Sequence, residues 1–146
     1  MLILGIELVV RSYVRPPENP IDPATAVYAN GLVPLPVLAT LRRACFDCHS
    51  DETRRPWYGA LPIASSLIER DIKEGRGRLN FSRWTQYSRF DRADLLDKAC
   101  ELAKKRAMPL WQYRILHREA VLSETDIAAL CDWTRNEAAR LVEESQ

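Results

Sequence analysis

The 146-residue sequence has little excess charge, few histidines and no long apolar run. Its 21 basic and 20 acidic residues give a formal net charge of +1, so it lacks the strong basic excess that marks nucleic-acid-binding proteins. The apolar run from Met1 to Val10 is far shorter than the roughly 20 residues that a bilayer-spanning helix needs. No alternating run of strand length and no internal repeat occurs. We therefore expect one all-α domain with no nucleic-acid partner.

Three regions are predicted along the chain. Residues 1–14 form an N-terminal apolar segment, which we interpret as the remnant of an export signal or membrane anchor, with a short packed helix as the alternative. Residues 15–36 hold six of the nine prolines and are predicted to form an extended linker or strap. Apolar residues such as Val27 and Val33 suggest that part of this strap lies on the domain. Residues 37–146 are expected to form the functional domain.

Apolar spacing predicts four or five helices in that domain. The first runs from Val37 to a pair of cysteines, Cys45 and Cys48. A second covers about residues 62–74, with Gly75 as its left-handed stop and Gly75 and Gly77 in a tight connection. A short helical piece follows near residues 80–84, capped by Asn80 or Ser82.

Two further helices are predicted in the second half of the chain. Asp91 and Asp94 resemble a capping arrangement that begins a helix extending to about residue 106. Pro109 forbids its continuation and leaves Met108 on a loop. Ser123 caps the last helix together with Asp126, and this helix runs to near residue 145.

The most informative motif is Cys45-Phe46-Asp47-Cys48-His49, the C-x-x-C-H spacing of covalent c-type haem attachment. Two thiols on one turn can each add to a vinyl group of one porphyrin, and the adjacent imidazole then reaches the iron from the same side. The expected cofactor is therefore one covalently attached haem c, with His49 as an iron ligand.

Two other functions share this spacing. A zinc site could use Cys45, Cys48, His49 and the distant His117. However, no second C-x-x-C pair and no H-x₃₋₅-H pair exists in the chain. A thioredoxin-like redox pair would need an α/β context that the sequence does not show.

The distal iron ligand has two candidates. Met108 is the only methionine besides Met1, and a Met thioether opposite a His is the pair that raises the reduction potential in cytochromes c. We favour Met108, with a flexible core filler as the alternative role. His117 is the only other histidine, and an ordinary surface or capping histidine is its default interpretation.

Side chains around the motif have both functional and structural interpretations. The nearby arginines either lie on a solvated face or pair with haem propionates; they are Arg42, Arg43, Arg54 and Arg55. The aromatic residues either wall a haem pocket or belong to the core; they are Trp57, Tyr58, Trp84, Trp111 and Tyr113. A backbone carbonyl between Pro56 and Ile63 is expected to orient His49.

The remaining cysteines, Cys100 and Cys131, fall on apolar helix faces. We expect each to be a separate, small buried hydrophobe, with a disulfide as the alternative in an oxidising compartment.

A series of motifs resembles the bacterial haem-binding domain family of single-haem c-type proteins. In order, these are C-x-x-C-H-S from Cys45, E-T, P-W-Y, D-x-x-E-G-R, N-F-S-x-W, and M-P at Met108 followed by a Tyr and a His. The resemblance spans roughly residues 34–135. It implies that Cys45 and Cys48 attach the haem, that His49 is the proximal ligand and that Met108 is the distal one. It also implies export, because members carry an N-terminal anchor before an Arg-Pro-Pro-like linker.

These observations predict a small cytochrome c-like bundle around one haem, acting as an electron carrier rather than an enzyme. Its partner would be a redox protein, and its place the periplasm or another extracytoplasmic compartment, with anchoring to the inner membrane through the N-terminal segment. A haem-based sensor or peroxidase-like enzyme with a labile distal ligand is the first alternative, and a zinc-binding module the second.

Overall fold

The structure is a computed structural model that describes residues 21–143. The predictions for residues 1–14 and for the first part of the linker lie outside the described residues. Within residues 21–143 every regular element is helical, which confirms the all-α prediction. The α-helices are α2 (Leu35–Ala44), α3 (Phe46–His49), α4 (Pro62–Arg78), α5 (Arg89–Lys104), α6 (Trp111–Leu116) and α7 (Glu124–Glu143). Four 3₁₀ turns connect them: η1 (Pro23–Thr25), η2 (Trp57–Ala60), η3 (Phe81–Gln86) and η4 (Arg118–Ala120).

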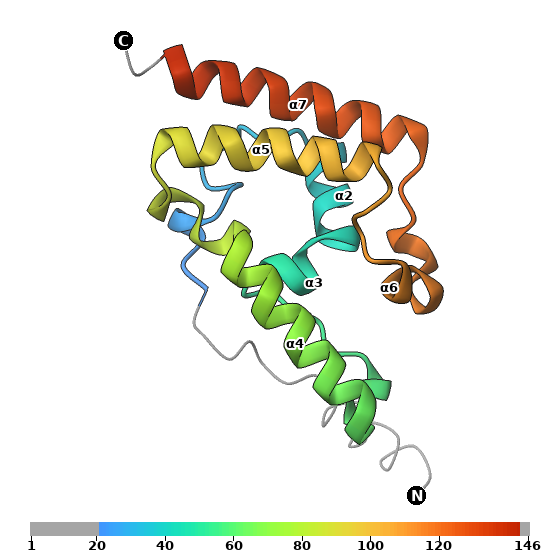
Figure 1. Cartoon of the computed structure of the whole chain (residues 1–146). Helices are drawn as coiled ribbons and strands as arrows, with labels where there is room; N and C mark the ends of the chain where they lie inside the picture. The colour runs from blue at the N-terminus through green and yellow to red at the C-terminus, as the bar shows by residue number, and fades with distance from the viewer. Residues whose placement is uncertain (1–20, 144–146) are drawn as a thin grey trace, which may run out of the picture.

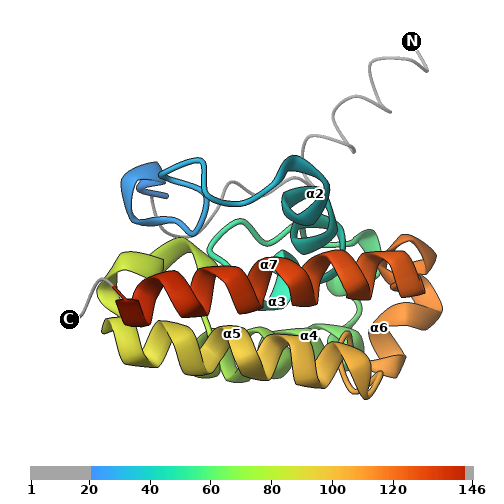
Figure 2. The same cartoon turned by 90° about the horizontal axis from the view of Figure 1, so that it is seen from above.

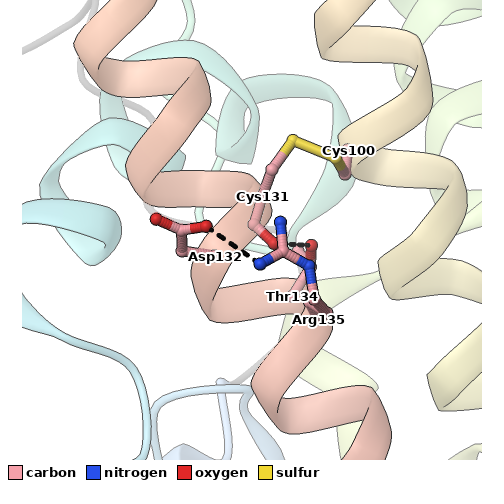
Figure 3. Close-up of a disulfide and its surroundings, with 5 residues drawn as sticks. All are labelled: Cys100, Cys131, Asp132, Thr134 and Arg135. Carbon is pink, nitrogen blue, oxygen red and sulfur yellow. Dashed lines mark hydrogen bonds and ion pairs between the residues drawn. A yellow bond between two sulfur atoms is a disulfide. The ribbon is translucent and has the colours of Figure 1, made fainter.

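Helices α5 and α7 lie side by side and antiparallel (Figures 1 and 2), at the top of the view in Figure 1. Their facing sides bury Leu96 and Ala103 from α5 and Leu130 from α7. A disulfide joins Cys100 of α5 to Cys131 of α7 across this contact (Figure 3), with the two Cα atoms 4.9 Å apart. The expectation of two separate cysteines is therefore wrong. Each does lie on an apolar helix face, but only the packing of α5 on α7 shows that the two faces meet.

Helix α2 covers α7 from the other side and leads directly into the cysteine motif. It buries Val37, Leu41 and Ala44, at the helical spacing of an amphipathic face. Val27 and Val33, which precede it in the chain, are also buried in the core. These two apolar residues of the predicted strap thus pack on the domain, whereas Leu32 and Leu35 are exposed.

Two helix starts agree with the predicted caps and one does not. Ser123 and Asp126 cap α7 reciprocally: the Ser123 hydroxyl accepts from the Asp126 amide at 3.0 Å, and the Asp126 carboxylate accepts from the Ser123 amide at 2.8 Å. Asn80 caps η3 by accepting from the Ser82 amide at 2.9 Å. Helix α5 begins at Arg89 rather than Asp91, because Ser88 is its N-cap and accepts from the Asp91 amide at 3.1 Å.

Two helix ends also differ from the predicted ones, and one helix was not expected. The first helix ends at Ala44, and the motif forms its own turn, α3. Helix α4 does not stop at Gly75 but continues to Arg78, so Gly75 and Gly77 are helical rather than parts of a tight connection. Helix α6 was not predicted, since six residues are too few to show a helical period. Among residues 21–143, no helix is both long and apolar enough to cross a bilayer.

Candidate functional site

The cysteine motif forms a single helical turn in the middle of the fold, between α2 and α4 (Figure 1). The Cys45 carbonyl accepts from the amides of Cys48 at 3.2 Å and His49 at 2.9 Å, which closes the turn. Cys45 and Cys48 are both half-buried free thiols, whereas Cys100 and Cys131 are paired. One turn therefore presents two unoxidised sulfurs and an imidazole.

Both thiols of the motif are held in the protonated state. Burial raises the pKa of Cys45 to about 12 and that of Cys48 to about 11. A thioredoxin-like dithiol works through a thiolate whose pKa is lowered toward neutrality. The environment of Cys45 and Cys48 therefore does not favour the redox-pair alternative.

The His49 imidazole is oriented by the backbone at the end of α4. Its Nδ1 lies 3.0 Å from the Leu79 carbonyl oxygen. Because a carbonyl only accepts, Nδ1 carries the proton and Nε2 keeps its lone pair. Burial lowers the pKa of His49 below its ordinary value, which favours the neutral ring. The predicted acceptor, a carbonyl between Pro56 and Ile63, is wrong, because α4 runs past Gly75 and brings Leu79 to the ring.

Gly75 lets α4 approach the motif closely. A Cβ on Gly75 would lie 2.5 Å from the carbonyl oxygen of Cys48 and 3.2 Å from its Cβ. Only glycine fits such a separation without displacing backbone. The glycine that was predicted to end α4 instead allows α4 to pack on α3.

Asp47, between the two cysteines, fastens α3 to α6. Its side chain is buried, and Oδ2 accepts a hydrogen bond of 2.6 Å from the Tyr113 hydroxyl. Oδ1 accepts from the amide and the guanidinium of Arg54, at 3.1 and 3.3 Å. Burial and the bond to Asp47 together raise the pKa of Tyr113 well above its ordinary value.

The polar residues that follow the motif form a buried network rather than a second reactive site. The Ser50 side chain is fully buried, donates to the Phe46 carbonyl and accepts from the Glu52 amide. The Arg76 guanidinium donates to the Ser50 carbonyl at 2.9 Å.

Asp51 joins the same network to the segment that follows α4. Its carboxylate accepts from the Asn80 side-chain amide at 3.0 Å, and its backbone amide donates to the Ser82 hydroxyl at 2.9 Å. Several motifs far apart in sequence thus meet behind the cysteine turn and hold it in place.

The two predicted distal residues have different surroundings. Met108 is half-buried on the loop between α5 and α6, as predicted, and its amide donates to the Leu102 carbonyl at 3.3 Å. His117 stacks on Tyr113, with ring centroids 4.1 Å apart. Its Nε2 lies 2.6 Å from the Tyr58 hydroxyl and its Nδ1 3.1 Å from a Glu119 carboxylate oxygen. Both ring nitrogens of His117 therefore already have partners within the protein.

Comparison with known families decides the cofactor class. The sequence profile of the haem-binding domain matches residues 4–136, which is nearly the whole chain. The chain belongs to the haem-binding domain family. Comparison with curated proteins and with solved structures finds no match.

The cysteine turn fits the cofactor of a haem-binding domain protein. Free thiols at Cys45 and Cys48 and an imidazole with an available Nε2 are the groups that would hold a haem. Large apolar side chains are also exposed on η2, at the start of α4 and on α6. They are Trp57, Leu61, Ile63, Leu67, Trp111, Ile115 and Leu116. Sequence reasoning singled out only the two tryptophans, because exposure of the others depends on packing.

The aromatic residues of this haem-binding domain divide between core and surface. Trp84 is buried among core residues. Trp57 and Trp111 are 72% and 62% exposed, so neither is a core aromatic. Tyr58 and Tyr113 are half-buried and use their hydroxyls to fix His117 and Asp47.

The four arginines near the motif are each engaged with the protein. Arg43 pairs with Asp126 at 2.6 Å, Arg54 pairs with Asp47, and Arg55 pairs with Glu69. Arg42 lies over the ring of Tyr28 at 5.3 Å. Their observed partners are thus carboxylates and an aromatic ring of the domain itself.

The zinc alternative finds no support in the geometry. Among residues 21–143, no three His, Cys, Asp or Glu side chains are arranged to hold a metal ion. The proposed fourth ligand, His117, is held by Tyr58 and Glu119 instead.

Proposed function

We propose that this haem-binding domain is a c-type electron carrier, with one haem attached through Cys45 and Cys48 and ligated by His49 and Met108. The observation that supports it most directly is the pairing of two free thiols with an oriented imidazole on one helical turn. When bound, the haem supplies an iron that changes between two oxidation states.

The residues of the turn have separate roles. Cys45 and Cys48 would form the two thioether bonds, which fix the cofactor without any help from binding affinity. The Leu79 carbonyl holds Nδ1 of His49, which would leave Nε2 to ligate the iron. Asp47 joins α3 to α6 through its hydrogen bond with Tyr113.

Met108 is the distal ligand in this proposal. A thioether needs no deprotonation to coordinate, and Met108 lies on a loop next to α6. His117 would first have to give up Tyr58 or Glu119, which makes it the weaker candidate. Two protein ligands leave the iron no open position, which favours electron transfer over catalysis.

An extracytoplasmic location belongs to the proposal. The Cys100–Cys131 disulfide is typical of proteins that fold in oxidising compartments. A redox protein is the expected partner, docking briefly through a small interface. The N-terminal segment would anchor the domain to the inner membrane.

Haem attachment is tested by expressing the exported full chain together with a c-type maturation system and measuring its intact mass. We expect the mass of one porphyrin to be added, and to be lost when Cys45 and Cys48 are both replaced by Ser. The matched control is the pair Cys100→Ser and Cys131→Ser, which should retain the haem. A colourless protein with Cys45 and Cys48 free to alkylation would overturn the proposal.

Axial ligation is tested with Met108→Ala in the holoprotein. We expect a lower reduction potential and loss of the weak near-infrared charge-transfer band of a sulfur-ligated ferric haem, with the haem still attached. His117→Ala is the control and should keep the band. A wild-type ferric protein that is high-spin and binds cyanide rapidly would instead favour the sensor or peroxidase-like function.

A further inference from the structure

Helix α5 ends in a left-handed turn immediately before Met108. The Arg106 amide donates to the Ala103 carbonyl, and the Ala107 amide donates to the Leu102 carbonyl, both at 3.0 Å. This is the hydrogen-bond pattern of a Schellman motif, with Arg106 at the left-handed position. The φ angle of Arg106 is 56°. Met108 follows only two residues later.

A residue with a side chain is unusual at this position. Glycine is preferred there, because a Cβ makes the left-handed conformation unfavourable. Among residues 21–143, Arg106 is the one non-glycine residue with positive φ. Contacts of the Arg106 side chain must therefore offset the unfavourable backbone conformation.

Those contacts reach the start of α7. The Arg106 guanidinium donates to the carbonyl of Leu122 and to the carboxylate of Glu124. Leu122 is itself buried in the core, so its carbonyl is a fixed point. One side chain thus ties the exit of α5 to the entry of α7.

The disulfide is a second connection between α5 and α7, in addition to the contacts of Arg106. The Cys100–Cys131 disulfide joins α5 to α7 (Figure 3). Cys100 lies six residues before Arg106, and Cys131 lies seven residues after Glu124. The loop that carries Met108 therefore leaves α5, a helix that is joined to α7 both by the disulfide and by Arg106.

We propose that Arg106 is a positioning residue for the distal methionine: its two contacts hold the loop so that the Met108 sulfur stays on the iron. This inference rests on the proposed function, in which Met108 is the ligand. In this role Arg106 acts through its contacts with Leu122 and Glu124.

The test compares ligand exchange in the ferric holoprotein of Arg106→Gly with that of the wild type. Glycine removes the guanidinium contacts and adopts the left-handed turn more readily than arginine, so any release of the loop comes from the lost contacts and not from the turn. We expect the near-infrared sulfur band to weaken and the affinity for added imidazole to rise by up to about tenfold, because losing the contacts with the Leu122 carbonyl and the exposed Glu124 carboxylate releases the loop. Glu124→Gln, which removes one charged partner and leaves the backbone unchanged, should shift both readouts in the same direction by less.

Lys105→Ala is the matched control. Lys105 is the neighbouring cation and pairs with Glu101 of its own helix, so its loss should leave imidazole affinity within about twofold. An Arg106→Gly protein with an unchanged band and unchanged imidazole affinity would overturn this inference. If Met108→Ala also left the band intact, the ligand assignment in the proposed function would be the part that fails.

Discussion

Gly75 and Cys48 approach so closely that a Cβ on the glycine would lie 2.5 Å from the cysteine carbonyl oxygen. This contact brings α4 against the cysteine turn and carries Leu79 to the imidazole of His49. Since the obstructing atom belongs to backbone, no side-chain rotation can relieve an added methyl group.

We therefore expect Gly75→Ala to destabilise the protein by about 1–3 kcal/mol through overpacking. Gly77→Ala is a matched control on the same helix, because nothing lies within 4 Å of its added Cβ. That variant should be neutral or more stable by up to about 1 kcal/mol, since alanine is the better helix former. Denaturant unfolding measures both. Equal free energies of unfolding for the two variants would show that the close approach is unimportant.

Asp47 and Tyr113 should contribute to the free energy of unfolding as a coupled pair, because they share a hydrogen bond. Tyr113→Phe leaves a buried carboxylate short of a donor, and we expect a loss of about 1–3 kcal/mol in unfolding free energy. A double-mutant cycle with Asp47→Ala should give a coupling energy above about 0.5 kcal/mol.

The control cycle for this bond combines Asp47→Ala with Tyr28→Phe, because the Tyr28 hydroxyl donates to Glu52 instead. This pair should be additive within about 0.5 kcal/mol. Additivity in the Tyr113 cycle as well would contradict a direct interaction of Asp47 with Tyr113.

The disulfide should contribute substantially to stability. Cys100 and Cys131 are 31 residues apart, and closing a loop of that length in the unfolded chain corresponds to about 3–4 kcal/mol. Replacing both cysteines by Ser should lower the unfolding free energy by an amount in this range, measured by denaturant titration of the holoprotein. With the haem iron already reduced in both proteins, further reduction of the disulfide should lower the unfolding free energy of the wild type by a comparable amount and leave that of the double variant unchanged. If reduction had no effect on the wild type, the bridge would contribute nothing.

The junction of α2 and α7 should make the protein sensitive to acid. Burial acts to raise the pKa of Asp126, but the Ser123 amide and hydroxyl and the Arg43 guanidinium lower it well below its usual range. A depressed native pKa stabilises the fold above the unfolded value of about 3.9, and that stabilisation is lost as pH falls below it. Asp126→Asn should therefore be less stable than the wild type at neutral pH, with the difference shrinking toward pH 2. A constant difference at all pH values would argue against this linkage.

Local features could be predicted from the sequence with good accuracy. The Ser123–Asp126 cap, the loop position of Met108 and the single-turn spacing of Cys45, Cys48 and His49 all depend on residues within a few positions of one another. Rules of helix capping, proline geometry and motif spacing act over that range. The starts of α4 and α7 were predicted for the same reason.

Long-range features could not be predicted. The acceptor for His49 is Leu79, 30 residues away, and its identity depends on how far α4 continues. Glycine is a residue type that often ends a helix, but Gly75 lies inside α4, where it is in close contact with Cys48. Helix α6 was missed because it is short, and with it the role of Tyr113.

The sequence by itself determined an all-α chain and the placing of Cys45, Cys48 and His49 on one turn, because helical periodicity and a five-residue spacing are properties of neighbouring residues. Only the tertiary structure decided which atoms orient that turn, that Cys100 and Cys131 face each other, and that His117 is held by Tyr58 and Glu119. These outcomes depend on which helix faces meet. That choice is made by the packing of the whole core, and no local pattern encodes it.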